Sequence, residues 1–146
     1  MKIRKYLELN ERSVVTCSPE DPVQKIAGML GGKNACALPV CDADGRMVGI
    51  VSERDVVRTL GEKGGDTLGL CARDLMSTSV TTCSPDDTMG RVRQIMYSKG
   101  FRNVPVLDGD TLLGVIGARD ALNTRLEEKE LEVNVLKDIV ITTRGT

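Results

Sequence analysis

Two spacings of apolar residues alternate along the chain. Apolar side chains recur at helical spacing in residues 21–32 and again in residues 87–99. Each of these segments is followed by two short apolar stretches joined by turn residues, which predicts a β-hairpin. The four stretches cover residues 36–41 and 46–51, then 103–107 and 111–116. Short strands at Val14–Cys17 and Val80–Cys83 are expected before the helices, and further helices after Val51 and after Ile116.

The pattern occurs twice because the sequence itself is repeated. VVTCSPED (residues 14–21) and VTTCSPDD (residues 80–87) agree at six of eight positions at an offset of 66 residues. After one residue is lost in the hairpin turn, GIVSERD (49–55) aligns with GVIGARD (114–120). Each half therefore predicts a strand–helix–strand–strand–helix unit of mixed α+β class. Neither half is large enough to be comfortably stable alone, so we expect them to pack face to face about a pseudo-two-fold axis.

The repeat also suggests boundaries. We expect a first domain over residues 5–60, a Gly-rich linker over 61–73, a second domain over 74–126, and a C-terminal extension over 127–146. Cys17 and Cys83 occupy equivalent positions, which favours a packing role over a disulfide. Five cysteines without a CxxC pair, in a sequence with no apolar leader, predict reduced thiols in the cytoplasm.

Residues 119–140 predict one long helix. Leu122, Leu126, Val133, Leu136 and Val140 follow an approximate a/d stripe, which Lys129 interrupts. Two interpretations remain open at this point: the stripe packs back on the domain, or it forms a helix–helix contact between two copies of the chain.

Charge and composition exclude several classes of protein. Twenty Lys and Arg against 21 Asp and Glu give a net charge of −1, which disfavours nucleic acid and anionic membranes as partners. There is no histidine, so Ser-His and Cys-His catalysis and His-based zinc sites are excluded. No window approaches the length of a membrane span, and three aromatic residues are too few for a base-stacking platform.

The segment GIVSERD carries the most chemical information. An apolar strand ends, and Ser52, Arg54 and Asp55 follow where a helix begins. A helix N-terminus is a ready anion site, a guanidinium pairs with phosphate, and a carboxylate suits the hydroxyls of a ribose. Ser52-x-x-Asp55 is equally compatible with a helix-capping box. In the second copy Gly117 replaces the serine, while Arg119 and Asp120 remain.

Together the segments SPEDPV…LPVCDADGRMVGIVSERDVV and SPDDTM…GFRNVPVLDGDTLLGVIGARDAL resemble a pair of CBS domains, the modules named after cystathionine β-synthase. The resemblance covers about residues 5–126. It implies a flat, pseudo-symmetric module that often dimerises, with adenosine-containing ligands bound in clefts between the repeats. Such ligands include AMP, ADP, ATP, NAD(H) and S-adenosylmethionine.

The resemblance also implies site residues. Ser52 and Asp55 match the motif that holds phosphate and ribose, and Asp120 matches in the second copy, where Gly117 departs from the hydroxyl residue. Arg54, Arg119 and Arg102 are the candidate phosphate ligands. The adenine is expected at Val15, Thr16, Ala37 and Leu38 in the first copy, and at Thr81, Thr82, Asn103 and Val104 in the second.

The sequence thus favours a non-catalytic regulatory module that binds an adenosine ligand and modulates an unidentified partner protein. It requires no cofactor and is expected to be a homodimer. An alternative is a dimeric interaction scaffold without a physiological ligand. An enzyme is disfavoured because acid pairs such as Asp86-Asp87 lie at a helix start, where they stabilise the helix.

Overall fold

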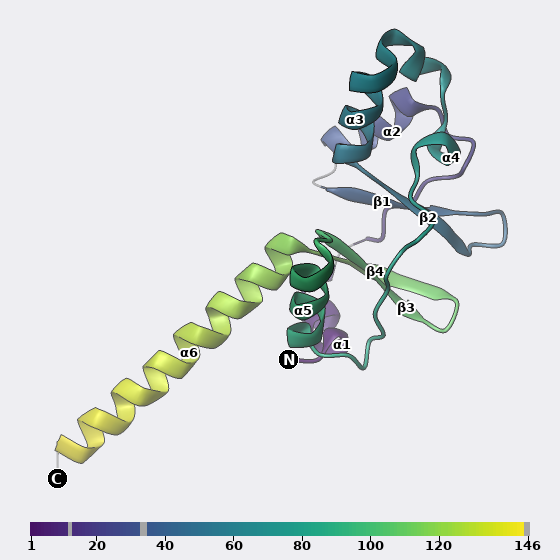
Figure 1. The fold of residues 1–146 in the computed structure, drawn as a ribbon. Helices are drawn as coiled ribbons and strands as arrows, with labels where there is room; N and C mark the ends of the chain where they lie inside the picture. Colours follow the sequence, from purple (N-terminus) through teal and green to yellow (C-terminus); the bar gives the residue numbers. More distant parts are fainter. Residues whose placement is uncertain (12, 33–34, 145–146) are drawn as a thin grey trace.

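A computed structural model describes residues 1–11, 13–32 and 35–144, with side chains described up to 137 and at 139. The chain forms two similar halves, each a two-stranded antiparallel sheet covered by helices, and a long helix that projects from the second half (Figure 1). The predicted mixed helix-and-strand class is confirmed, with both β-hairpins in place.

The first half is built on the hairpin of β1 (Ala37–Cys41) and β2 (Met47–Ser52), with helices α2 (Val23–Gly32) and α3 (Glu53–Lys63) beside it (Figure 1). Its core gathers the apolar face of each element. The buried members are Cys17, Val23, Ile26, Leu30, Leu38, Val40, Val51, Ala72 and Leu75.

The second half repeats this plan with β3 (Asn103–Asp108), β4 (Thr111–Gly117), α5 (Met89–Lys99) and the start of α6 (Ala118–Arg144). Its buried core consists of Ile3, Tyr6, Cys83, Met89, Val92, Ile95, Val104, Val106, Ile116 and Ala121. Cys17 and Cys83 are buried and unpaired in the two cores, in agreement with the predicted packing role.

The strands predicted at Val14–Cys17 and Val80–Cys83 are much shorter in the structure. Each consists of a single parallel bridge. Cys17 donates its N–H to Pro39 O and accepts from Cys41 N, at 3.0 and 2.9 Å. Extending this ladder upstream would require an N–H from Pro39, and extending it downstream would require one from Pro19. Proline has no N–H, so the pairing stops in both directions.

The same explanation holds in the second half. Cys83 bridges Val106 in parallel, donating to Pro105 O and accepting from Leu107 N at 2.9 Å in each case. Pro85 and Pro105 there take the places of Pro19 and Pro39.

Two short helices cross between the halves. Helix α1 (Ile3–Leu9), which the apolar pattern did not predict, contributes Ile3 and Tyr6 to the core of the second half. Helix α4 (Ala72–Leu75) follows the 3-10 helix η1 (Gly64–Gly69) and contributes to the core of the first half. The segment that precedes each repeat therefore completes the core of the other repeat.

Equivalent backbone bonds anchor the two helices. Ile3 N donates to Asp87 O, and Ala72 N donates to Asp21 O, both at 2.9 Å. Arg4 and Arg73 donate likewise to Pro85 O and Pro19 O, again at 2.9 Å. Helices α1 and α4 are thus structural counterparts.

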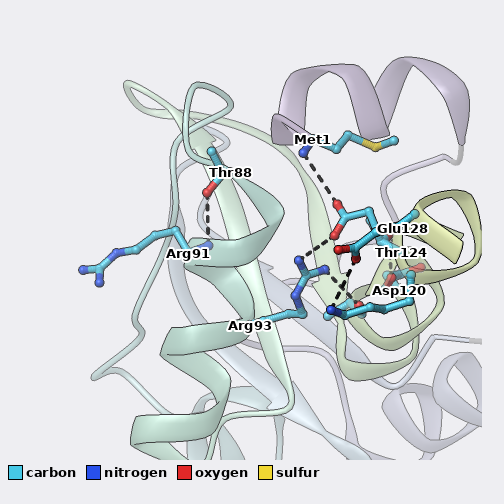
Figure 2. A network of polar contacts seen from close by, with 10 residues as sticks. Met1, Thr88, Arg91, Arg93, Asp120, Thr124 and Glu128 are labelled. Atoms are coloured by element: carbon cyan, nitrogen blue, oxygen red, sulfur yellow. Dashed lines mark hydrogen bonds and ion pairs between the residues drawn. The ribbon is translucent and has the colours of Figure 1, made fainter. Parts of the chain in front are cut away.

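Among the residues of α6 whose side chains are described, those of the first turns pack on the body. Ala121 and Thr124 are buried, and Glu128 accepts from Arg93 of α5 at 3.0 Å (Figure 2). Beyond them the helix extends away from both halves (Figure 1). Its exposed aliphatic side chains are Leu122, Leu126, Leu131, Val133, Val135, Leu136 and Ile139. The idea that the Leu122–Leu136 stripe packs back on the domain is therefore wrong, while the side chain of Val140 lies outside the described residues.

Within the described residues, none of the helices has both the length and the apolar character needed to cross a bilayer.

The turn before α2 depends on a carboxylate. Asp21 Oδ2 accepts from Ser18 N at 2.9 Å, and Oδ1 pairs with Lys25 at 3.2 Å. The Ser18 N–H, aided by Lys25, lowers the pKa of Asp21 below its ordinary value. A carboxylate with a depressed folded-state pKa stabilises the fold above the pKa of the unfolded chain, and that stability is lost as the pH falls through the folded-state pKa.

We expect Asp21→Asn to lower the free energy of unfolding at pH 7 by about 1 kcal/mol. The deficit relative to wild type should begin to shrink below about pH 4, the ordinary pKa of an aspartate, and should fall further as the folded wild-type carboxylate is protonated at its lowered pKa. Urea unfolding between pH 3 and 7 measures both effects. Asp44→Asn, in an exposed hairpin turn, is the matched control. A deficit that stayed constant down to pH 3 would contradict the ionic origin of the effect.

Candidate functional site

The N-terminus of α3 combines the residues that the sequence singled out. Asp55 N bonds Ser52 Oγ at 3.3 Å, while Asp55 Oδ2 accepts from Ser52 N at 2.8 Å and from Ser52 Oγ at 2.9 Å. The capping box is therefore formed. Capping does not exclude ligand binding, because Ser52 Oγ and the first N–H groups of α3 lie at the positive end of the helix dipole.

Two of the four candidate adenine residues of the first repeat, Ala37 and Leu38, lie beside this helix start. Ala37 pairs with Ser52, and Leu38 with Val51, in the β1–β2 register. Val15 and Thr16 precede the Cys17 bridge to Val40, and Thr16 lines a groove with Cys41 and Arg46, near the opposite end of β1. The structure thus brings together one edge of the first sheet and the start of α3. Leu38 is fully buried, so its side chain belongs to the core and only its backbone is available to a ligand.

The second repeat places its candidates in the same way. Asn103 pairs with Gly117, Val104 pairs with Ile116, and the bridge at Cys83 sets Thr81 and Thr82 along β3. Asp120 Oδ2 accepts from Gly117 N at 2.8 Å, so half of the capping arrangement survives without the serine. Figure 2 shows Asp120 and Thr124 at the start of α6, where Thr124 Oγ1 donates to Asp120 O at 2.8 Å.

Arginines surround the two helix starts. Arg54, Arg102 and Arg119 are all exposed, so each side chain is available to an anion in solvent. A fourth arginine, Arg58, was not singled out by the sequence, yet its guanidinium pairs with Asp55 Oδ1 at 2.8 Å. Its position one helical turn beyond Asp55 was the available signal, since residues three apart share a helix face.

Tyr6 was also missed. Its hydroxyl donates to Asp120 Oδ1 at 2.5 Å from helix α1, 114 residues away in sequence. No local spacing predicts a contact of that range, because it depends on the crossing of α1 to the second half.

A groove of about 480 Å³ lies between the turns of the two hairpins. Its lining residues are Val14, Thr16, Cys41, Asp44, Gly45, Arg46, Asp110, Thr111 and Leu112. Arg46 and Asp110 face each other across it at 3.9 Å, both largely exposed. Thr16 is one of the expected site residues, whereas Asp55 and Asp120 do not line this groove.

The buried cysteines have no nucleophilic character. Burial raises the pKa of Cys17 to about 11 and that of Cys83 to about 12, with Asp21 and Asp87 adding to the effect. Both thiols therefore stay protonated at neutral pH. Among the residues that the structure describes, no three His, Cys, Asp or Glu side chains are grouped so as to hold a metal ion.

Comparison with solved structures shows the same architecture elsewhere. A CBS-domain containing protein from Agrobacterium tumefaciens, ATU1752, superposes with a TM-score of 0.80 and 31% identity, covering 85% of this chain and 92% of that one. CBSX2, solved in complex with AMP, gives a TM-score of 0.72 at 21% identity over 82% of this chain and 92% of its own. The CBS domain pair of MJ0100, solved with 5′-methylthioadenosine and S-adenosyl-L-methionine, gives 0.75 at 21% over 89% and 98%.

Sequence comparison agrees. An uncharacterized protein of Methanopyrus kandleri, MK0525, is 28% identical over 116 residues, which is 79% of this chain and 59% of that protein. Since the chain spans less than two thirds of this relative, the whole relative's activity does not transfer to it. The family model of the CBS domain matches residues 8–62 and again residues 72–127. The chain therefore belongs to the CBS domain family and carries two tandem copies of the domain.

Proposed function

We propose that this protein is a non-catalytic regulatory module that binds an adenosine-containing ligand in a cleft between its repeats. The observation that carries the proposal is the start of α3, where Asp55 lies 8% exposed beside Ser52 at the end of an apolar strand. A hydroxyl, the N-terminus of a helix and a fixed carboxylate occur together there. This set matches the polar groups of a nucleotide.

Each group has a distinct task in this proposal. Ser52 Oγ and the N–H groups of α3 bind the substituent on the 5′ carbon, with Arg54 pairing a phosphate when there is one. Asp55 accepts hydrogen bonds from the ribose hydroxyls. The backbone of Leu38 and the segment Val15–Thr16 hold the adenine ring, and the half-buried side chain of Val15 packs against it.

The exposed ion pair of Arg58 with Asp55 does not oppose binding. Arg58 is 53% exposed, and pairs of this kind contribute at most about 1 kcal/mol. The guanidinium can therefore swing into solvent, or onto an anionic ligand, as a ribose hydroxyl takes its place on Asp55 Oδ1.

The ligand complexes of the structural neighbours support an adenosine ligand and leave its 5′ substituent open. CBSX2 was solved with AMP, whereas the MJ0100 pair was solved with a thioether and a sulfonium derivative of adenosine. The groups that these ligands share are adenine and ribose. Asp55 and the adenine-binding edge of β1 therefore carry the proposal more than the arginines do. ADP, ATP and NAD(H) present the same adenine and ribose.

We further propose that the module acts as a homodimer in the cytoplasm and regulates another protein. The described molecule exposes 9439 Å², whereas a compact monomer of this mass exposes about 7,300 Å². The excess of about 2,100 Å² exceeds the roughly 800 Å² that each partner contributes to a standard interface.

The projecting helix α6 accounts for this excess of exposed surface area. We propose that α6 of a second copy packs against it in the dimer. Leu122, Leu126, Val133 and Leu136 recur at spacings of four, seven and three residues, so they form one stripe. Lys129 interrupts the stripe between Leu126 and Val133, and Glu127, Glu128 and Glu130 surround it in sequence. In the proposed dimer, the lysine of one copy pairs with glutamates of the other.

The second candidate function is an interaction scaffold whose nucleotide sites do not bind a ligand. The exposed stripe of α6 favours it, as does the loss of the hydroxyl at Gly117. This scaffold would dimerise through the same helix but would show no response to adenosine compounds.

Asp55→Asn should abolish ligand binding, because an amide cannot accept both ribose hydroxyls as the carboxylate does. We expect AMP or S-adenosylmethionine, at 100 times its dissociation constant, to stabilise the wild type by about 2.7 kcal/mol. That is a rise of roughly 5 °C in midpoint. The rise should disappear in the variant when each protein is compared with its own ligand-free midpoint.

Glu53→Gln is the matched control, because Glu53 is an exposed acid in the same first turn of α3. It should keep the full ligand-induced rise. A rise that persisted in Asp55→Asn would overturn the site, and a flat response of the wild type to all adenosine compounds would favour the scaffold.

Val133→Glu together with Leu136→Glu should convert the dimer into monomers, since two charges would be buried in the seam. Sedimentation velocity across a dilution series should show the dissociation constant raised at least tenfold. Asn134→Glu adds a charge to the same exposed turn outside the stripe and should leave the dimer intact. Equal dimerisation of all three proteins would exclude α6 as the seam.

A further inference from the structure

The two repeats differ in what occupies the carboxylate at the start of their second helix. In the first repeat, Asp55 Oδ1 is held by the exposed guanidinium of Arg58 at 2.8 Å. In the second, Asp120 Oδ1 accepts from the hydroxyl of Tyr6 at 2.5 Å, and Tyr6 is only 8% exposed. Apart from Gly117 in the place of Ser52, the two helix starts share their main contacts: Thr59 and Thr124 donate to Asp55 O and Asp120 O, both at 2.8 Å.

The difference originates in the crossing helices. The equivalent bonds from Ile3 and Ala72 show which residues of α1 and α4 occupy matching positions. Three residues further on, Tyr6 of α1 is therefore the counterpart of Leu75 of α4. Both side chains are buried in their respective cores. Leucine ends in methyl groups, so it fills the core and offers nothing to Asp55. Tyrosine fills the core with its ring and carries a donor out to the carboxylate.

The two occupants also differ in how easily they leave. Arg58 is a long, exposed side chain, and its departure from Asp55 disturbs no packing. Tyr6 can withdraw its hydroxyl only if its ring leaves the core or if α1 moves. Helix α1 is fixed by fully buried Ile3 and by backbone bonds from Ile3 N and Arg4 N to residues of the second repeat.

The burial of the two aspartates does not explain why Asp120 has the buried partner and Asp55 the exposed one, because Asp120 is itself the less buried of the two. Asp120 is half-buried, whereas Asp55 is buried. Asp120 is thus the more exposed of the two residues. Its Oδ1, which corresponds to the oxygen of Asp55 that pairs with Arg58, nevertheless accepts a short hydrogen bond from the buried Tyr6. A ribose hydroxyl would have to compete with that bond.

We propose that Tyr6 closes the second-repeat site, so that the protein binds one adenosine-containing ligand per chain, at the first repeat. The proposal rests on the proposed function, because it assigns that function to one of the two helix starts. Gly117 adds to the closure by removing the hydroxyl, but Tyr6 is the group that determines it.

The test separates Tyr6 from Gly117. A Cβ built on Gly117 would lie 3.4 Å from Asp120 Oδ2 and 3.7 Å from Asn103 Oδ1, which is ordinary contact, so a serine fits there. Isothermal titration calorimetry with AMP, repeated with S-adenosylmethionine, should give one ligand per chain for the wild type and for Gly117→Ser. The double variant Tyr6→Phe with Gly117→Ser should bind two.

Two controls complete the series. Tyr97→Phe with Gly117→Ser removes a hydroxyl that is 93% exposed and should remain at one ligand. Asp120→Asn alone should bind one ligand with an affinity within twofold of wild type, whereas Asp55→Asn should bind none. If the phenylalanine variant fails to unfold cooperatively on heating, Tyr6→Leu replaces it, since leucine is the residue that α4 carries at the equivalent position.

Either of two stoichiometries would overturn the proposal: two ligands bound by the wild type or by Gly117→Ser, or one ligand bound by the double variant. An affinity reduced tenfold or more in Asp120→Asn would overturn it as well. Failure of the proposed function gives a different result, namely no binding of either compound by any of these proteins, the double variant included.

Discussion

The docking of one short helix from outside each repeat is the interaction on which the rest of the molecule depends. A two-stranded sheet with two helices beside it cannot bury enough apolar surface to be stable by itself. Helix α4 supplies Ala72 and Leu75 to the first core, and α1 supplies Ile3 and Tyr6 to the second. Because each helix precedes the other repeat in sequence, the two halves are tied together by the chain itself. Neither core is complete without residues that lie outside its own repeat.

This constraint also positions the chemistry. The same backbone bonds that seat α1 on the second half bring the Tyr6 hydroxyl to Asp120, while those that seat α4 bring an apolar side chain to the matching place. Two helix starts with nearly identical local geometry thereby acquire different chemical surroundings. Besides the local change from Ser52 to Gly117, the tyrosine of α1 against the leucine of α4 distinguishes them, and Tyr6 acts from a segment that is remote in sequence from Asp120.

Much of the fold was predictable because it is encoded locally. The repeated VVTCSPED and VTTCSPDD segments, the helical spacing after each and the hairpin turns predicted α2, α5 and all four strands to within about two residues. The short first strands were not predicted, because apolar content suggests a strand, whereas the missing N–H groups of Pro19 and Pro39 limit its hydrogen bonds. Helix α1 was missed because its apolar residues Ile3 and Tyr6 become a buried face only once the second half is present.

The candidate site also combines features that are encoded locally with features that depend on long-range contacts. Ser52, Asp55, Gly117 and Asp120 lie at helix starts where the spacing placed them, and the β registers bring Ala37 and Asn103 opposite Ser52 and Gly117. These relations are local, so a pattern of strand, turn and helix captures them. The pairing of Arg58 with Asp55 was also within reach, because residues three apart share a helix face. The bond of Tyr6 to Asp120 depends instead on the crossing of α1, which no local spacing expresses.

The two arrangements of the carboxylate have a consequence for regulation. A ligand shifts a conformational equilibrium only to the extent that it binds two arrangements with different affinity. At the first repeat, a ligand would displace an exposed arginine and disturb no packing, so binding there changes surface charge more than structure. At the second repeat, the carboxylate is bonded to a core residue of α1, and the neighbouring α6 is joined to α5 through Arg93 and Glu128 (Figure 2). Any influence that loosened α1 would therefore be transmitted to the base of the projecting helix. In the proposed function, the ligand site at the first repeat is therefore separate from the Tyr6–Asp120 bond at the base of α6, and a partner that contacts α1 or α6 would not compete with the ligand.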